Sequence, residues 1–140
     1  MIEFFIPGNP IPLKRHRHYK NRVYDPQKEE KLVTGCLIRQ HSTLVELTSE
    51  PLEMTLTFYF KIPKNRPVPS IIDGKMCQHH SQKPDLDNLI KFICDVMNDI
   101  IYKDDSQICK ITATKQYCIG YEEAGTNVII KKVKTKATPC

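Results

Sequence analysis

The sequence predicts an α+β fold in which a mixed β-sheet packs against two main helices. Two segments carry apolar residues at helical spacing, and four others have the alternating or β-branched pattern of strands. The predicted order is β-α-β-α-β-β, which interleaves the two kinds of element. The 140 residues suit one domain over 1–140, long enough to bury roughly two thirds of its unfolded surface.

The first half of the chain is expected to hold a strand, a loop, a helix and a second strand. Residues 2–6 form a short apolar strand, and the basic, proline-framed segment 7–26 is expected to be a loop. An Asp-Pro step then suits the N-cap and first position of a helix over 27 to about 47. Residues 52–62 alternate between apolar and polar side chains, which is the clearest strand pattern in the chain.

The second half is expected to hold a long loop, a helix and two strands. The loop covers 63–84, and the helix runs from 86 to about 98 or 100. One apolar stripe of this helix is formed by Leu86, Ile90, Ile93, Met97 and Ile100. Strands over 107–119 and 126–133 should form an antiparallel hairpin, followed by a flexible basic tail at about 134–140.

Composition narrows the class of protein. The net charge of +5 favours acidic partners such as nucleic acid. No apolar run approaches the ~20 residues that span a bilayer, and the apolar start is too short for a signal peptide. The six cysteines contain no CxxC pair, so we interpret them as free, mostly buried thiols. A cytoplasmic protein without a membrane partner is the simplest interpretation.

The most informative stretch is 83–107, because acidic residues gather at both ends of the predicted helix. Asp85 and Asp87 stand at its start, and an Asp104–Asp105 pair follows its end. Carboxylates held close together repel one another, whereas a divalent cation between them removes this cost. Enzymes use such carboxylate-bound cations to act on phosphates. The stretch therefore indicates a metal-dependent enzyme that acts on nucleic acid.

Each of these residues, taken singly, also has an ordinary structural interpretation. Asp85 suits a helix N-cap and Asp87 a first-turn acid, which the helix dipole favours by ~0.3–1 kcal/mol. Lys91, one turn after Asp87, could form an (i, i+4) ion pair worth ~0.3–0.5 kcal/mol, or reach a phosphate. Asp95 lies one turn further along. From the residues alone, a metal site and a purely structural arrangement both stay open.

The whole pattern resembles the signature of the RusA-type Holliday junction resolvases, a family of crossover junction endodeoxyribonucleases of bacteria and their phages. The matching positions are Asp85, Asp87, Asn88, Lys91, Asp95, Asp104, Asp105, Ser106 and Gln107. The resemblance implies a Mg²⁺-dependent homodimer that resolves four-way junction DNA by paired symmetric nicks, in recombination and repair. It assigns catalytic and metal-binding roles to Asp85, Asp87 and Asp105, and a catalytic role to Lys91.

Phosphodiester hydrolysis suits these residues. Mg²⁺ prefers oxygen ligands and keeps several waters, so Asp85, Asp87 and Asp105 suffice without histidine, and Mn²⁺ is expected to substitute. Such a metal neutralises the phosphodiester, lowers the pKa of a bound water and stabilises the departing oxygen. Lys91 would stabilise charge that develops on the phosphate. Two further acids are candidates for a supporting role beside the ligands: Asp95 and Asp104.

The length of the helix predicts that one chain cannot complete this site. A helix over 86–100 is roughly 22 Å long, and five further residues reach back at most about 17 Å. Two such helices, packed antiparallel about a twofold axis, would bring Asp105 of one chain near Asp85 and Asp87 of the other. A helix that stops at Asn98 would leave the chain room to fold back, which weakens this inference.

A basic cluster in segment 7–26 is expected to contact DNA. Basic side chains release counterions from phosphates, and the tyrosines among them can stack on unpaired bases. The candidate DNA-binding residues are Lys14, Arg15, Arg17, Lys20 and Arg22. A merely solvated basic loop is the structural alternative. For His79 and His80, just before the acidic motif, exposure in a loop is the simplest interpretation.

Two other functional classes stay open. A non-catalytic junction- or DNA-binding protein would use the acids only to cap helices, and it would bind without Mg²⁺ and never nick. A metal-dependent phosphoryl or glycosyl transferase could also use an Asp-x-Asp motif, but the chain has no Gly-rich phosphate loop. The cleavage preference and the choice between one and two metals are not predicted.

Overall fold

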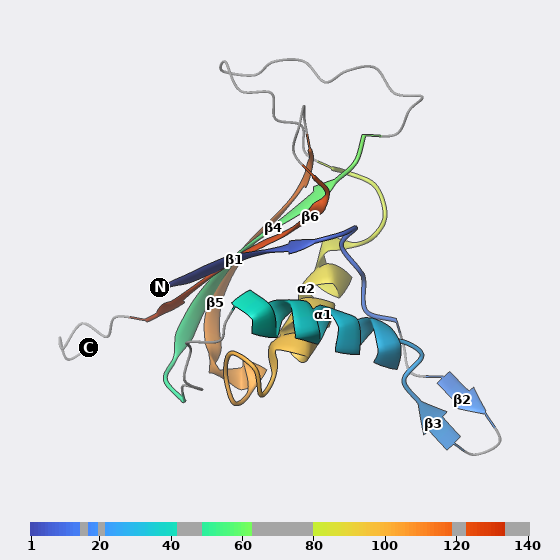
Figure 1. The fold of residues 1–140 in the computed structure, drawn as a ribbon, viewed down its shortest axis with the longest axis horizontal. Coiled ribbons are helices and arrows are strands. Elements are labelled where there is room, and N and C mark those ends of the chain that lie inside the picture. Colours follow the sequence, from blue (N-terminus) through green and yellow to red (C-terminus); the bar gives the residue numbers. More distant parts are fainter. Residues whose placement is uncertain (15–16, 20–21, 42–48, 63–79, 119–122, 134–140) are drawn as a thin grey trace.

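The computed structural model describes residues 1–14, 17–19, 22–41, 49–62, 80–118 and 123–133 and contains a four-stranded sheet with two helices (Figure 1). The main elements are β1 (Ile2–Pro7), α1 (Lys28–His41), β4 (Leu52–Phe60), α2 (Leu86–Met97), β5 (Ile108–Tyr117) and β6 (Gly125–Lys132). The predicted class, a mixed sheet with two main helices, is confirmed. The prediction missed a two-stranded ribbon, β2 (Arg17–Tyr19) and β3 (Arg22–Tyr24), within the expected basic loop.

The strand order β1-β6-β4-β5 shows that the predicted C-terminal hairpin is wrong. In the described part of the chain, β6 is antiparallel to β1 and β4 and does not pair with β5. β5 instead lies parallel to β4 at the edge of the sheet. The reason is that α2 connects β4 to β5, and a helical crossover returns the chain so that the second strand starts at the same end as the first.

Alternation along β4 buries one face of the sheet, as predicted. Leu52, Met54, Leu56 and Phe58 are at most 2 % exposed, while Thr55 among them is exposed. The buried side chains join residues of both helices in one hydrophobic cluster. Burial of each contributes about 1.5–3 kcal/mol, so the position of α2 against the sheet is strongly determined.

α2 is buried over a wider arc than the single predicted stripe. Leu86 and Ile90 belong to that stripe but are only half-buried. The buried positions of the helix are Leu89, Phe92, Ile93, Cys94, Val96 and Met97. The arc is wide because α1 packs against α2 in addition to the sheet. Gly35 of α1 lies at this contact, where an added Cβ would stand at ordinary contact distances of 3.4 Å from Ile100 Cδ1 and 3.8 Å from Val96 Cγ1.

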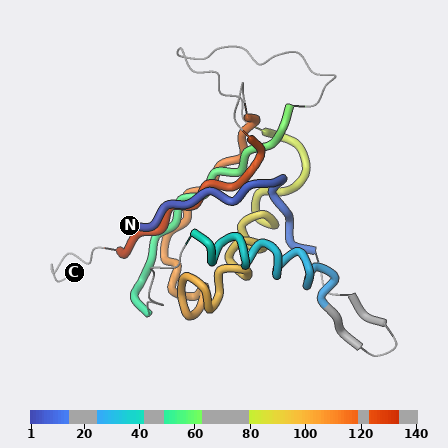
Figure 2. The backbone as a smooth tube through the Cα atoms, viewed as in Figure 1, coloured from blue at the N-terminus to red at the C-terminus, as the bar shows by residue number. Residues whose placement is uncertain are grey.

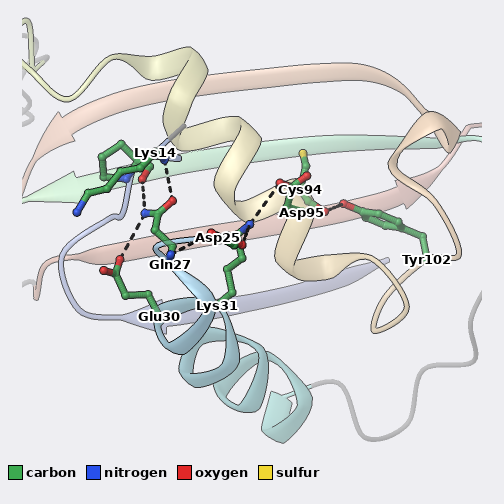
Figure 3. Close-up of polar contacts among 9 residues, drawn as sticks. Lys14, Asp25, Gln27, Glu30, Lys31, Cys94, Asp95 and Tyr102 are labelled. Atoms are coloured by element: carbon green, nitrogen blue, oxygen red, sulfur yellow. Dashed lines mark hydrogen bonds and ion pairs between the residues drawn. The ribbon is translucent and has the colours of Figure 1, made fainter. Parts of the chain in front are cut away.

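After α2 the chain turns back through a short, tightly bonded segment. Asp99 has a positive φ of 63°, and its N–H donates to the Tyr102 carbonyl at 2.8 Å. The Tyr102 side chain is fully buried, and its hydroxyl donates to the Cys94 carbonyl at 2.8 Å (Figure 3). Because Tyr102 bonds to Cys94, the turn returns the chain only as far as the last turns of α2. Burial also raises the pKa of the Cys94 thiol to about 11.

A buried glutamine closes the base of the β2–β3 ribbon. The Gln27 side chain accepts a hydrogen bond from the Lys14 N–H at 2.7 Å and donates to the Pro12 carbonyl at 2.8 Å (Figure 3). The Gln27 N–H donates to Asp25 Oδ1 at 2.9 Å. Because a buried polar group without a partner costs about 1–3 kcal/mol, these bonds hold the entry and exit of the basic segment together beside α1.

Two expectations from composition have different outcomes. The four cysteines in the described residues are free, but only Cys94 and Cys118 are buried, whereas Cys36 and Cys109 are exposed. The expectation of mostly buried thiols is therefore wrong for half of them. No helix among the described residues is long and apolar enough to cross a membrane. The predicted end of the first helix at 42–47 and the tail at 134–140 lie outside the described residues.

Candidate functional site

Asp85 is the N-cap residue of α2, and its carbonyl accepts a hydrogen bond from the Leu89 N–H at 3.3 Å. Its backbone is extended, with φ −68° and ψ 139°, yet its side chain makes no capping hydrogen bond. The carboxylate lies 4.0 Å from the Lys83 ammonium, and 56 % of the Asp85 side chain is exposed. This carboxylate therefore interacts with the helix through the positive end of the dipole and not through a capping hydrogen bond.

Asp87 and Lys91 form a loose ion pair on the first two turns of α2. Their charged atoms are 3.8 Å apart, and the side chains are 69 % and 60 % exposed. An exposed (i, i+4) pair contributes at most about 0.5 kcal/mol. Either group can therefore exchange its partner for a cation or a phosphate at little cost. The structure thus places both acids and the lysine at the same end of α2.

Asp104 has a turn-forming role at the other acidic group. It is the N-cap of a short 3₁₀ helix, η1 (Asp105–Gln107), and its N–H donates to Gln107 Oε1 at 3.0 Å. Its carboxylate accepts a hydrogen bond from the Ser106 hydroxyl at 2.8 Å. This bond lowers the pKa of Asp104, and a hydrogen bond with Asp105 adds to the effect. These contacts give Asp104 a structural role, because they hold the turn that leads into β5.

Asp105 lies near the C-terminal end of α2. Desolvation raises the pKa of Asp105, and so do its hydrogen bond with Asp104 and the negative charges of Asp104 and Asp95. The short segment Asp105–Gln107 contacts α2, and the effect of Asp95, in the last turn of α2, agrees with a position of Asp105 near that end of the helix. A cation bound there would relieve this concentration of negative charge.

Asp95 is engaged by the other helix. The Lys31 ammonium of α1 lies 2.6 Å from the Asp25 carboxylate and 3.8 Å from that of Asp95 (Figure 3). Asp95 therefore links α1 to α2 and adds negative charge near Asp105. Sequence reasoning missed Lys31, because its partner lies on a different helix and no local spacing connects the two.

The two acidic groups lie at opposite ends of α2 within one chain. α2 has 12 residues and is therefore about 18 Å long, and the turn after it returns only to the level of Cys94. Among the described residues, no three His, Cys, Asp or Glu side chains are grouped closely enough to hold a metal ion. The helix ends at Met97, close to the shorter of the two predicted ends, yet the chain does not return Asp105 to Asp85.

The carboxylates at the start of α2 nevertheless fit one class of metal. Mg²⁺ is commonly held by one or two carboxylates while it keeps several waters and binds a substrate phosphate. Asp85 and Asp87 are exposed, closely spaced and only weakly engaged, so they meet this requirement. Two carboxylates leave coordination positions of the ion open, and a third carboxylate from elsewhere would fill one of them.

The basic segment begins beside this end of α2. The Leu13 N–H donates to the Asn88 carbonyl at 2.9 Å, and the neighbouring Lys14 side chain is exposed. Figure 2 shows segment 8–14 passing alongside α2 toward the start of α1. The β2–β3 ribbon, which carries the backbones of Arg17 and Arg22, projects from there (Figure 1). Two predicted DNA-binding residues lie outside the described residues: Arg15 and Lys20.

His80 is packed against the sheet. Its ring stacks on that of Phe60, with centroids 4.3 Å apart, and lies 4.8 Å from the ring of Tyr117. The backbone N–H of His80 donates to the Lys115 carbonyl at 3.0 Å. The expectation of an exposed loop residue is therefore wrong for His80, and His79 lies outside the described residues. This packing anchors the segment that leads into α2.

Sequence comparisons relate the chain to a nuclease family and to a bacterial protein. The family described as Endodeoxyribonuclease RusA matches residues 7–131, a range that includes the basic segment and both acidic groups. The chain is also 30 % identical over 146 residues to "Uncharacterized protein YqaN" of Bacillus subtilis (strain 168). That alignment covers 94 % of this chain and 96 % of the relative.

Proposed function

The chain belongs to the RusA endodeoxyribonuclease family, and from this premise we propose a Mg²⁺-dependent nuclease that resolves four-way DNA junctions in recombination and repair. One observation carries the metal dependence. Asp85 and Asp87 present two exposed carboxylates at the start of α2, Asp85 makes no capping hydrogen bond, and the Lys91 ammonium lies 3.8 Å from Asp87. Helix caps and surface ion pairs alone would not need this arrangement.

Asp85 and Asp87 would hold Mg²⁺, with Mn²⁺ as a substitute. When bound, the metal supplies neutralising charge at the phosphodiester and a more acidic water. α2 contributes the positive end of its dipole, which draws an anionic phosphate to the same place as the two carboxylates. Lys91, one turn further along, would donate to a phosphate oxygen where negative charge develops.

A second copy of the chain would supply the third carboxylate. β5 runs opposite to α2: it begins just after Asp105, and near its end the Lys115 ammonium reaches the Pro84 carbonyl at 2.8 Å, next to Asp85. If two β5 edges paired antiparallel about a twofold axis, the start of one strand would lie beside the end of the other. Asp105 of the partner subunit would then approach Asp85 and Asp87.

The exposed surface of β5 supports this choice of interface. In the described part of the chain, β5 pairs with β4 on one side only and is an edge strand of the sheet. Ile111, near its middle, is 40 % exposed. An exposed edge strand with an apolar side chain invites pairing with another strand, and a twofold axis near Ile111 would cover both copies of it. Two equivalent sites also suit paired nicks in a junction of near-twofold symmetry.

A labelled four-way junction, incubated with and without Mg²⁺, tests the proposed function. We expect paired symmetric nicks with Mg²⁺ or Mn²⁺, none with a chelator, and far less cleavage of a linear duplex of the same sequence. A non-catalytic junction-binding protein would retard the junction in a gel but leave it uncut at every protein concentration, and that outcome would contradict the proposal.

The basic segment is expected to bind DNA phosphates. Arg15→Ala combined with Arg17→Ala should weaken junction binding and reduce the slope of log K against log[salt] by about two phosphate contacts. Binding titrations over a salt series measure this slope. Lys131→Ala combined with Lys132→Ala removes the same charge from the end of β6 and serves as the control. An unchanged slope in the arginine variant would remove the segment from the DNA interface.

A further inference from the structure

We propose that Lys115 of β5 is a positioning residue for the Asp85 carboxylate and that it acts through the backbone of the segment before α2. This role depends on the proposed metal site at the start of α2, and it adds to that site a residue from another element. Local sequence patterns do not reveal it, since a single lysine in an edge strand is normally a solvated residue.

Lys115 clamps the segment that leads into α2. Its ammonium donates to the Gln82 carbonyl at 2.7 Å and to the Pro84 carbonyl at 2.8 Å. Its own carbonyl accepts the His80 N–H at 3.0 Å. Three hydrogen bonds therefore tie one residue of the sheet to three positions of the segment just before Asp85. The two side-chain bonds are charge-assisted and stronger than bonds between neutral groups.

The bond to Pro84 bears directly on Asp85. The Pro84 carbonyl belongs to the same planar peptide unit as the Asp85 nitrogen. A hydrogen bond that holds this oxygen therefore restrains the backbone orientation of Asp85 and the direction in which its side chain leaves. Asp85 has no capping hydrogen bond that would do this from its own side chain.

The other end of the clamp is fixed on a rigid element. His80 stacks on Phe60 at the end of β4 and lies 4.8 Å from the ring of Tyr117 at the end of β5. Segment 80–84 is thus held by side chains of two neighbouring strands. Ligand side chains supported in this way are more precisely placed than ligands on an unsupported loop.

The clamp makes a prediction about metal affinity. Lys115→Met retains the length of the side chain and removes its donors, and Lys115→Arg retains donors. Lys131→Met makes the same change at an exposed position of β6, away from the proposed β5 interface, and serves as the control. Mn²⁺ binding without DNA, measured by electron paramagnetic resonance of the free ion, should weaken at least about tenfold in Lys115→Met. It should recover substantially in Lys115→Arg and stay unchanged in Lys131→Met. Nicking by Lys115→Met should recover toward the wild-type rate at saturating Mn²⁺.

Two results would overturn the clamp. The first is an unchanged Mn²⁺ affinity in Lys115→Met, with or without a lower melting temperature. The second is an unchanged affinity with slow nicking at saturating Mn²⁺, because this would mean that Lys115 contacts the phosphate. If Lys115→Met does not fold, Lys115→Gln carries the test, and its reduced donor capacity predicts an intermediate loss of affinity. A wild-type protein that binds no Mn²⁺ and cuts no junction would contradict the proposed function itself. If the wild-type protein binds Mn²⁺ and cuts the junction, and Lys115→Met does both equally well, only the role of Lys115 is contradicted.

Discussion

Asp87→Asn is expected to abolish Mg²⁺-dependent nicking and to leave the fold intact. The amide keeps the size of the side chain but removes the charge that would bind the cation. Because loss of a mere partner of a ligand typically costs 10–100-fold, loss of a ligand should lower the nicking rate at least about 100-fold. Asp87 is 69 % exposed and only loosely paired with Lys91, so the change in unfolding free energy should stay below about 0.5 kcal/mol.

Single-turnover nicking of a labelled junction and thermal unfolding together check this prediction. Glu29→Gln is the matched control, because Glu29 is also an exposed first-turn acid, on α1. It should change neither nicking nor melting temperature. Without metal, Asp87→Asn should bind the junction at least as well as wild type, since a negative charge beside the phosphate is gone. Near wild-type nicking by Asp87→Asn in Mg²⁺ would show that Asp87 is not a ligand.

Local patterns in the sequence predict the start of α2 and the burial of β4. The alternation from Leu52 to Phe58 determines which face of β4 is buried, because side chains alternate strictly in a strand. The spacing of Asp87 and Lys91 places them on neighbouring turns, because four residues make about one helical turn. These features depend only on residues close together in the chain.

Contacts between distant segments could not be predicted in this way. The choice of β6 to lie between β1 and β4, instead of beside β5, depends on the whole sheet. Two lysines contact elements that are far from them in the sequence, and no local spacing predicts such contacts. They are Lys115, which bonds to segment 82–84, and Lys31, which pairs with Asp95. Both lysines bear on the candidate site, so its surroundings were the least predictable part of the molecule.

The separation of Asp105 from Asp85 was predicted from a helix over 86–100, the longer of the two expected lengths. α2 ends at Met97, short enough for the chain to fold back. The chain does fold back, but the buried Tyr102 bonds to the Cys94 carbonyl and stops its return near the end of the helix. The contact of the buried Tyr102 with Cys94, and not the length of the helix, therefore keeps Asp105 away from Asp85.

Mixed dimers should therefore recover activity that neither inactive chain has alone. If an Asp87→Asn chain pairs with an Asp105→Asn chain, one composite site contains Asp85, Asp87 and Asp105 intact, and the other site carries both substitutions. Random pairing makes half of the dimers mixed, so nicking should return to about a quarter of the wild-type rate. Each mixed dimer has one working site, so the main product should be a singly nicked junction and not two resolved duplexes.

Mixing Asp85→Asn with Asp87→Asn chains is the matched control for this experiment. Both substitutions fall at the same end of α2, so every composite site in the mixed dimer still lacks one ligand and no activity should return. If all three aspartates of a site came from one chain, the Asp87→Asn and Asp105→Asn mixture would stay as inactive as this control, because every chain in it carries a defective site. The difference between the two mixtures, measured on the same labelled junction, therefore reports whether Asp105 acts across the subunit boundary.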